Sequence, residues 1–211
     1  TIYMFSGNPG TGKTYHIVKE VILPELQSPK PRPIYHNIRL KPEVIECELL
    51  RPTALHGIVH PVTSEWFLTM YNHVEMIKGS LIIIDEVQNV FNSGRPMSDL
   101  KLVEFFTTHR HHCIDIVLGT QENSNINKVV RSLIEVDNRF YKLKDKTGVN
   151  AYRVETWYKD DKKATGSKKR FYDPEYFKFY SSYALAPVSA GLVESPVIPK
   201  NYTARSYLLI P

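Results

Sequence analysis

The chain has 211 residues, 42% of them hydrophobic, which is enough for one sizeable core and one main domain with an appendage. Its only cysteines, Cys47 and Cys113, are too few for a disulfide framework, and no run reaches the roughly 18 apolar residues that span a bilayer, so we expect a soluble piece from a reducing compartment. The net charge of +5 suits contact with nucleic acid or an anionic membrane face without requiring either.

The first half of the chain predicts strands and helices in alternation. Residues 2–6 (IYMFS) predict a short strand, and apolar residues at 17, 18, 21, 22 and 26 predict a helix that begins at Lys13. The proline-rich PKPRP then ends the helix and leads into PIYHNIRL (33–40), a second candidate strand. A further helix is predicted at 64–77.

The second half continues this alternation and ends in a hairpin. LIIID (81–85) and IDIVLG (114–119) are apolar runs of the kind that parallel sheets bury on both faces. Helices are predicted at 97–109 and near 125–134. The segments NRFYKLKD and NAYRVETWY flank KTGV and predict an antiparallel hairpin.

The glycine-rich stretch after the first strand matches a phosphate-binding loop (P-loop) at every specified position. GNPGTGKT, from Gly7 to Thr14, fits G-x-x-x-x-G-K-[ST] between a predicted strand and a predicted helix. Its glycines let consecutive backbone N–H groups point at an anion, helped by the positive end of the helix. We expect Lys13 to reach the β- and γ-phosphates and Thr14 to ligate Mg²⁺. The residues assigned to nucleotide binding are Gly7, Asn8, Pro9, Gly10, Thr11, Gly12, Lys13, Thr14 and Tyr15.

Three polar residues after two later strands complete the predicted site. Asp85 ends LIIID, so its carboxylate should lie at the carboxyl edge of the sheet and hold Mg²⁺ through water. Glu86 beside it is the candidate general base for the attacking water. Gln121 follows the next strand and either orients water near the γ-phosphate or only caps the strand. The Asn-Lys pair in NKVV lacks the aspartate of a guanine-binding N-K-x-D motif, which favours ATP.

Two arginines and one basic stretch are candidates for contacts outside the chain's own site. Ring ATPases complete a neighbour's site with an arginine, and Arg110 or Arg131 could serve, the alternative being an ordinary surface arginine. The stretch 159–170 holds six basic and two acidic residues. We expect it to be a polar loop that contacts DNA or anionic lipid, or a solvated hairpin tip.

Several of these stretches together resemble one family. GNPGTGKTY, YHNIRL, LIIIDEVQNVF, THRHHCIDIVLGTQ and FYDPEYFKFYSSY occur in the order and style of the zonular occludens toxin (Zot) family. This family includes the inner-membrane assembly ATPases of filamentous phages. The resemblance runs from residue 1 to about residue 183. The P-loop alone is shared by very many proteins, and its combination with HRH, the following strand, TQ and the DP-x-x-F-x-x-Y pattern is far more specific.

The pattern and the resemblance together predict the fold and the domains. We expect an α/β fold, a RecA-like P-loop NTPase with three layers around a mostly parallel sheet, plus a C-terminal β-hairpin extension. The chain divides into a P-loop ATPase core at 1–145 and a hairpin and Tyr/Pro-rich extension at 146–211, which leads towards a membrane span after residue 211.

The resemblance also implies a function. It implies an ATP- and Mg²⁺-dependent motor on the cytoplasmic face of the inner membrane, which forms a homo-oligomeric ring and powers extrusion of phage DNA with coat or assembly proteins. Two other readings stay open: a soluble DNA translocase or helicase ring, and a nucleotide-gated interaction domain with little hydrolysis. Glu86 argues weakly against the latter.

Overall fold

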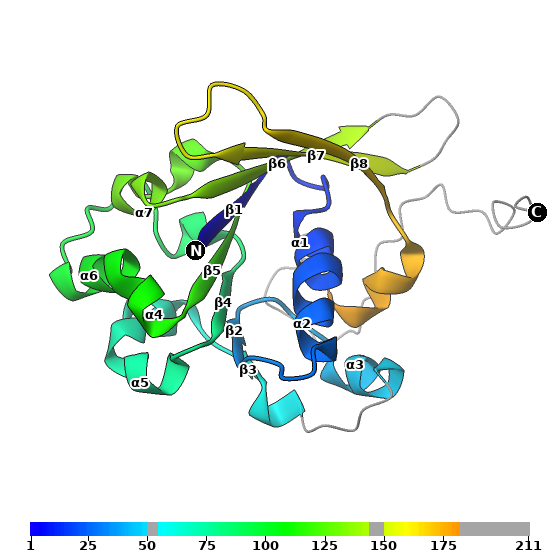
Figure 1. Cartoon of the computed structure of the whole chain (residues 1–211), viewed down its shortest axis with the longest axis horizontal. Helices are drawn as coiled ribbons and strands as arrows, with labels where there is room; N and C mark the ends of the chain where they lie inside the picture. The colour runs from blue at the N-terminus through cyan, green and yellow to red at the C-terminus, as the bar shows by residue number, and fades with distance from the viewer. Residues whose placement is uncertain (50–54, 144–149, 182–211) are drawn as a thin grey trace, which may run out of the picture.

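The computed structural model describes residues 1–49, 55–143 and 150–181 as an eight-stranded sheet between two groups of helices (Figure 1). The strand order is β3-β2-β4-β5-β1-β6-β7-β8. Neighbours from β3 to β6 run parallel, and β7 and β8 are added antiparallel at one edge. This confirms the predicted α/β fold with a mostly parallel sheet.

The strands are short in the parallel part and longer in the antiparallel part. Their bounds are β1 Ile2–Ser6, β2 Ile34–His36, β3 Val59–Pro61, β4 Leu81–Ile84, β5 Asp115–Thr120, β6 Val136–Leu143, β7 Ala151–Tyr158 and β8 Gly166–Phe171. All four residues of β4 are buried, as expected for a central strand that both helical layers cover.

The helices lie on both faces of the sheet, which gives three layers (Figure 1). One face carries α1 Lys13–His16, α2 Leu23–Gln27, α3 Pro42–Glu48 and a 3₁₀ segment, Pro174–Phe179. The other face carries α4 Ser64–Leu68, α5 Val74–Ile77, α6 Leu100–Thr108 and α7 Lys128–Ser132. None of the helices in the described residues is long and apolar enough to cross a membrane.

The predicted elements agree with the structure where their patterns are strong. The predicted strand at 2–6, the apolar strands before Asp85 and Gln121, and the antiparallel hairpin are confirmed. The predicted helix from Lys13 extends to Gln27, with a π-helical segment, Ile17–Ile22, between α1 and α2. The single helix predicted at 64–77 is instead divided by a 3₁₀ segment, Met70–His73.

The basic stretch 159–170 is not one polar loop. After a turn, its second half forms most of β8, which pairs antiparallel with β7. Residues 159–165 do form the tip of the hairpin between β7 and β8, but the predicted loop was too long, because GSKKRF lacks the apolar alternation of a typical strand. β8 is the last strand of the sheet, and its lysines, which point to both faces of the strand, are exposed. Nothing in its sequence pattern therefore predicts a strand.

The segment after β8 folds back onto the helix that begins at the P-loop. The backbone N–H of Asp173 donates to the Tyr15 hydroxyl at 2.8 Å, and that of Lys41 donates to the carbonyl of Phe179 at 2.8 Å. Phe179 and Tyr180 are buried in the same core cluster as Tyr15. The end of the described chain is therefore packed close to its beginning.

Candidate nucleotide-binding site

The P-loop has the geometry that its glycines predict. Gly7 begins the loop directly after β1, and a Cβ there would lie 2.5 Å from the carbonyl oxygen of Phe140 on β6. Gly12 precedes α1 with a φ of 88°, in the left-handed region that glycine adopts without strain. Asn8, Pro9 and Gly10, which lie between them, are exposed. The Thr11 hydroxyl donates to the Asn8 carbonyl at 2.7 Å and closes the loop.

Lys13 is buried within this loop. Its ammonium donates to the carbonyl oxygens of Gly7, at 2.7 Å, and Asn8, at 3.3 Å. Burial lowers the pKa of Lys13, and the negative charges of Glu86 and Asp85 partly oppose that shift. The lysine therefore already points into the loop, at the place where a phosphate group would sit.

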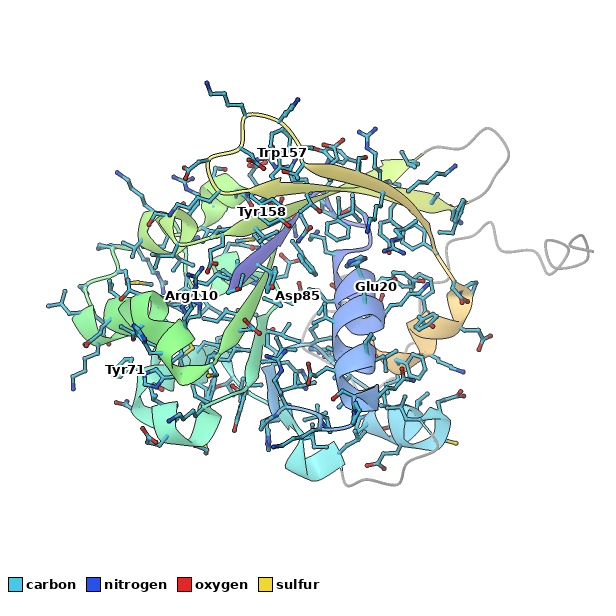
Figure 2. The ribbon with its side chains drawn as sticks, in the orientation of Figure 1. Glu20, Tyr71, Asp85, Arg110, Trp157 and Tyr158 are labelled. Atoms are coloured by element: carbon cyan, nitrogen blue, oxygen red, sulfur yellow. The ribbon has the colours of Figure 1, made fainter. Side chains whose placement is uncertain are left out.

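The two candidate metal ligands, Thr14 and Asp85, are in contact. The Thr14 hydroxyl donates to Asp85 Oδ2 at 2.7 Å, although 70 residues separate them. Asn37, directly after β2, fixes the Asp85 backbone with two hydrogen bonds of 2.8 Å. Gly119 makes room for the carboxylate, since a Cβ there would lie 2.5 Å from Asp85 Oδ1. Asp85 is central in Figure 2, between the sheet and α1.

This pair of oxygen ligands fits Mg²⁺. Hydroxyl and carboxylate oxygens are the donors that this cation prefers, and sites of this kind use one or two protein ligands beside phosphate oxygens and water. Burial raises the pKa of Asp85, while the hydrogen bond from Thr14 lowers it. The residues predicted to bind a metal are therefore brought together by the fold.

Glu86 is held in an uncommon backbone conformation beside Asp85. Its φ of 52° lies in the left-handed region, where non-glycine residues are strained and which recurs at functional sites. Gln88 Nε2 donates to Glu86 Oε2, and Gln121 Nε2 lies 3.4 Å from both carboxylate oxygens. The Thr120 hydroxyl in turn donates to Gln88 Oε1 at 2.9 Å. The predicted base and the predicted water-orienting residue thus face each other.

Tyr15 is directed away from the loop. Its ring is buried and packs edge-on against Tyr152, Tyr172 and Tyr176, with centroids 5.3 to 6.2 Å apart. Its hydroxyl accepts the hydrogen bond from Asp173. The Tyr15 side chain is therefore engaged in the core and with the segment after β8, and its assignment to nucleotide binding stays a prediction.

The two candidate arginines lie apart from the site. Arg110 precedes β5 and pairs with Glu135, which precedes β6, so both lie at the amino edge of the sheet. Asp85 follows β4 at the carboxyl edge, and Figure 2 shows the two residues well separated. Arg131 is exposed on α7. Neither arginine approaches the phosphate loop of its own chain.

Three residues that contribute to the site were not predicted. Asn37 was hidden inside the overlong strand predicted at 33–40, although a polar residue after an apolar run is a signal for a strand end. For Gln88, the only sequence signal was its position two residues after Glu86. Tyr172 lies so close to Gly12 that a Cβ there would be 2.7 Å from Tyr172 Cε1, a contact without any local sequence signal.

Comparison with known proteins supports the fold and identifies the family. A family model described as zonular occludens toxin (Zot) matches residues 1–186. The N-terminal domain of zonular occludens toxin from Neisseria meningitidis is similar in structure, with a TM-score of 0.58 and 20% identity, over 85% of this chain and 98% of that chain. No curated protein matches the chain in sequence.

A second solved structure shares less of the architecture. The genome packaging NTPase B204 from Sulfolobus turreted icosahedral virus 2, in complex with ATP-γ-S, matches with a TM-score of 0.49 and 16% identity. That match covers 69% of this chain and 77% of the packaging NTPase.

Proposed function

The chain belongs to the zonular occludens toxin (Zot) family, and from this we propose that it is an ATP-binding and ATP-hydrolysing motor domain that powers filamentous phage assembly and extrusion across the inner membrane. One observation carries the proposal. The Thr14 hydroxyl and the Asp85 carboxylate are joined at 2.7 Å beside a buried P-loop lysine, and Glu86 is the next residue.

Each residue of the site has a chemical task in ATP hydrolysis. Lys13 exchanges the loop carbonyls for phosphate oxygens and neutralises their charge. Thr14 and Asp85 would hold Mg²⁺, which supplies further neutralisation of phosphate charge when bound. Glu86 accepts a proton from the attacking water at its carboxylate, and Gln121, beside it, orients that water.

The wider function concerns partners and location. We place the domain on the cytoplasmic face of the inner membrane, in a homo-oligomeric ring, with phage DNA and coat or assembly proteins as partners. The core at 1–145 would supply the motor, and the extension at 146–211 would connect it to a membrane span. The packing of Phe179 and Tyr180 beside Tyr15 supports a mechanical link between the two parts.

Replacing the proposed base tests the function. Glu86→Gln should bind ATP as the parent does but lose turnover by about 100-fold or more, because an amide cannot accept a proton from water. Calorimetry gives the affinity, and phosphate release gives the rate. Glu104→Gln, an equivalent change at an exposed position of α6, should leave both unchanged. Hydrolysis at the parent rate by Glu86→Gln would show that Glu86 is not the base.

A further inference from the structure

The last three strands present a sheet face that no helix of the described residues covers (Figure 1). Side chains alternate between faces along a strand, and Phe140, Tyr152 and Val154 are buried on the side of α1. Their strand neighbours therefore point the other way. The cations and large rings of this outer face are Arg139 and Tyr141 on β6, Arg153 and Trp157 on β7, and Lys169 and Phe171 on β8, and Asp137 and Glu155 lie on the same face.

The strand register places these residues in rows. Tyr141 is paired with Arg153, and Arg153 with Lys169, so one row crosses all three strands. Phe171 and Tyr141 are 53% and 38% exposed, which is unusual for large aromatic side chains. Trp157 lies on β7 next to Tyr158, which points to the opposite face (Figure 2).

Each aromatic ring of the outer face has a cation above it. The Arg139 guanidinium lies 4.2 Å from the ring centre of Trp157, and that of Arg153 lies 5.0 Å from the ring centre of Tyr141. The Lys169 ammonium lies 5.1 Å from the ring centre of Phe171. The outer face thus carries three pairs of a cation and a flat ring.

Two carboxylates orient the arginines without cancelling the charge of the region. Asp137 accepts from Arg139 Nε at 2.8 Å, and Glu155 lies 3.1 Å from Arg153 Nε. Both contacts are on the Nε side of the guanidinium. On the outer face itself three cations stand against these two carboxylates. The wider region, which includes the turn before β8 and the opposite face, holds nine basic and four acidic side chains across residues 136–143 and 150–171.

We propose that the outer face binds single-stranded nucleic acid, with bases stacked on its aromatic rings and backbone phosphates at its cations. Aromatic rings together with cations are the features that bind single strands without regard to sequence. A duplex fits less well, because its bases are stacked on each other and cannot stack on the rings. An anionic lipid surface would use only the cations and would leave the rings unexplained. Binding of a single strand is argued from the outer face alone, and only the identity of that strand as phage DNA rests on the proposed function.

The test measures binding of a labelled single strand of about 16 nucleotides to the nucleotide-free protein by fluorescence anisotropy. Tyr141→Leu combined with Phe171→Leu should raise Kd about tenfold or more, because two stacking surfaces are lost while apolar bulk remains. Tyr158→Leu is the matched control, since Tyr158 is 53% exposed at the end of the same sheet but points to the opposite face, and it should leave Kd unchanged.

A second variant tests the phosphate contacts. Arg153→Gln combined with Lys169→Gln should reduce the salt dependence of binding, by about 0.7 in the log–log slope for each cation removed. Lys101→Gln combined with Lys128→Gln removes the same charge from exposed positions of α6 and α7 and should leave the slope unchanged.

Three results would overturn the proposal. The first is absence of single-strand binding by the parent protein, and the second is an equal loss of binding in the outer-face and control variants. The third is that the outer-face variants lose binding to phosphatidylglycerol vesicles but keep their binding to the oligonucleotide, which would assign the outer face to anionic lipid. ATP turnover is measured on the same proteins. Intact turnover without single-strand binding would reject the outer face and leave the proposed ATPase standing, whereas absent turnover with normal single-strand binding would do the reverse.

Discussion

Lys13 satisfies its charge with loop carbonyls in the absence of nucleotide. The Gly7 and Asn8 oxygens are arranged around an ammonium that is almost completely buried. A phosphate group that enters the loop offers this ammonium a full negative charge in exchange for two carbonyl dipoles. The ammonium is attracted more strongly by a full negative charge than by carbonyl dipoles, and this attraction is least screened at a buried position, so the exchange favours binding.

We expect Lys13→Ala to abolish detectable ATP binding, because it removes the charge that faces the phosphates. Asp85→Asn should instead weaken only the Mg²⁺-dependent part of the affinity, since Thr14 keeps a partner at that position. Calorimetry with and without Mg²⁺ separates the two effects. Lys101→Ala, at an exposed position on α6, is the control. Unchanged affinity in Lys13→Ala would contradict nucleotide binding by this loop.

His16 makes the stability of the domain depend on pH. Burial lowers the pKa of His16 to about 4, and the positive charges of Arg170 and Lys19 contribute to the shift. The unfolded chain binds this proton near pH 6.5, so the contribution to stability is complete above that pH and is lost as the pH falls towards 4. The loss for one such histidine is about 3 kcal/mol.

We expect His16→Gln to flatten this part of the pH profile, because the amide does not titrate in this range. The amide can still form a hydrogen bond with the Tyr152 hydroxyl, which lies 3.0 Å from His16 Nδ1. Urea unfolding at a series of pH values between 7 and 4 measures the effect. The parent should lose about 3 kcal/mol more than the variant across this range. Parallel profiles for the two proteins would show that His16 does not titrate differently on unfolding.

At the scale of elements, the segment that follows β8 and the P-loop constrain each other. Gly12 has a positive φ, and its missing Cβ leaves the space that Tyr172 fills. Gly12→Ala should therefore lower the free energy of unfolding for two reasons, backbone strain of about 1–3 kcal/mol and a collision with the Tyr172 ring.

A double-mutant cycle separates these two contributions. Tyr172→Ala removes the collision and leaves the strain, so the cost of Gly12→Ala should be smaller in that background by about 0.5–3 kcal/mol. Gly57→Ala, where a Cβ would meet nothing within 4 Å, is the control substitution. Strictly additive losses of unfolding free energy would show that the loop and the Tyr172 ring are independent.

Sequence patterns predict those elements whose signal is local. The strand at 2–6, the P-loop and the Asp85–Glu86 pair each lie within one short run, and the parallel sheet then brings their ends together. β3 and β8 were missed because three-residue and highly basic strands lack the alternation on which prediction depends. The contacts of Asn37 and Tyr172 depend on register and on packing between distant segments, which no local pattern contains.

At the scale of the whole molecule, neither of the two proposed arginines lies near the γ-phosphate side of the site in its own chain. Arg110 lies at the amino edge of the sheet and Arg131 is exposed on α7, so either could act only on a neighbouring subunit. A ring in which each subunit completes the next would explain both positions.

We expect ATPase activity to rise more than in proportion to protein concentration. Mixing Arg110→Ala chains with Lys13→Ala chains, or Arg131→Ala chains with Lys13→Ala chains, should restore part of the activity, since mixed interfaces contain one complete site. The control is each variant alone at the same total concentration. Activity that stays linear in concentration across oligomer formation, with neither mixture rescued, would exclude an arginine supplied in trans.

The central position of β1 has a consequence for synthesis on the ribosome. Its partners are β5 and β6, which are synthesised much later. Ile2 pairs with Ile116 and Tyr3 pairs with Val136, so neither pair can form until the later residue has left the ribosome. At about 5–20 residues per second this delay is on the order of ten seconds, during which an apolar strand and the loop after it have no sheet to join. The sheet around the loop therefore cannot be completed until β6 has emerged, and the apolar side chains of β1 have no strand partners until then.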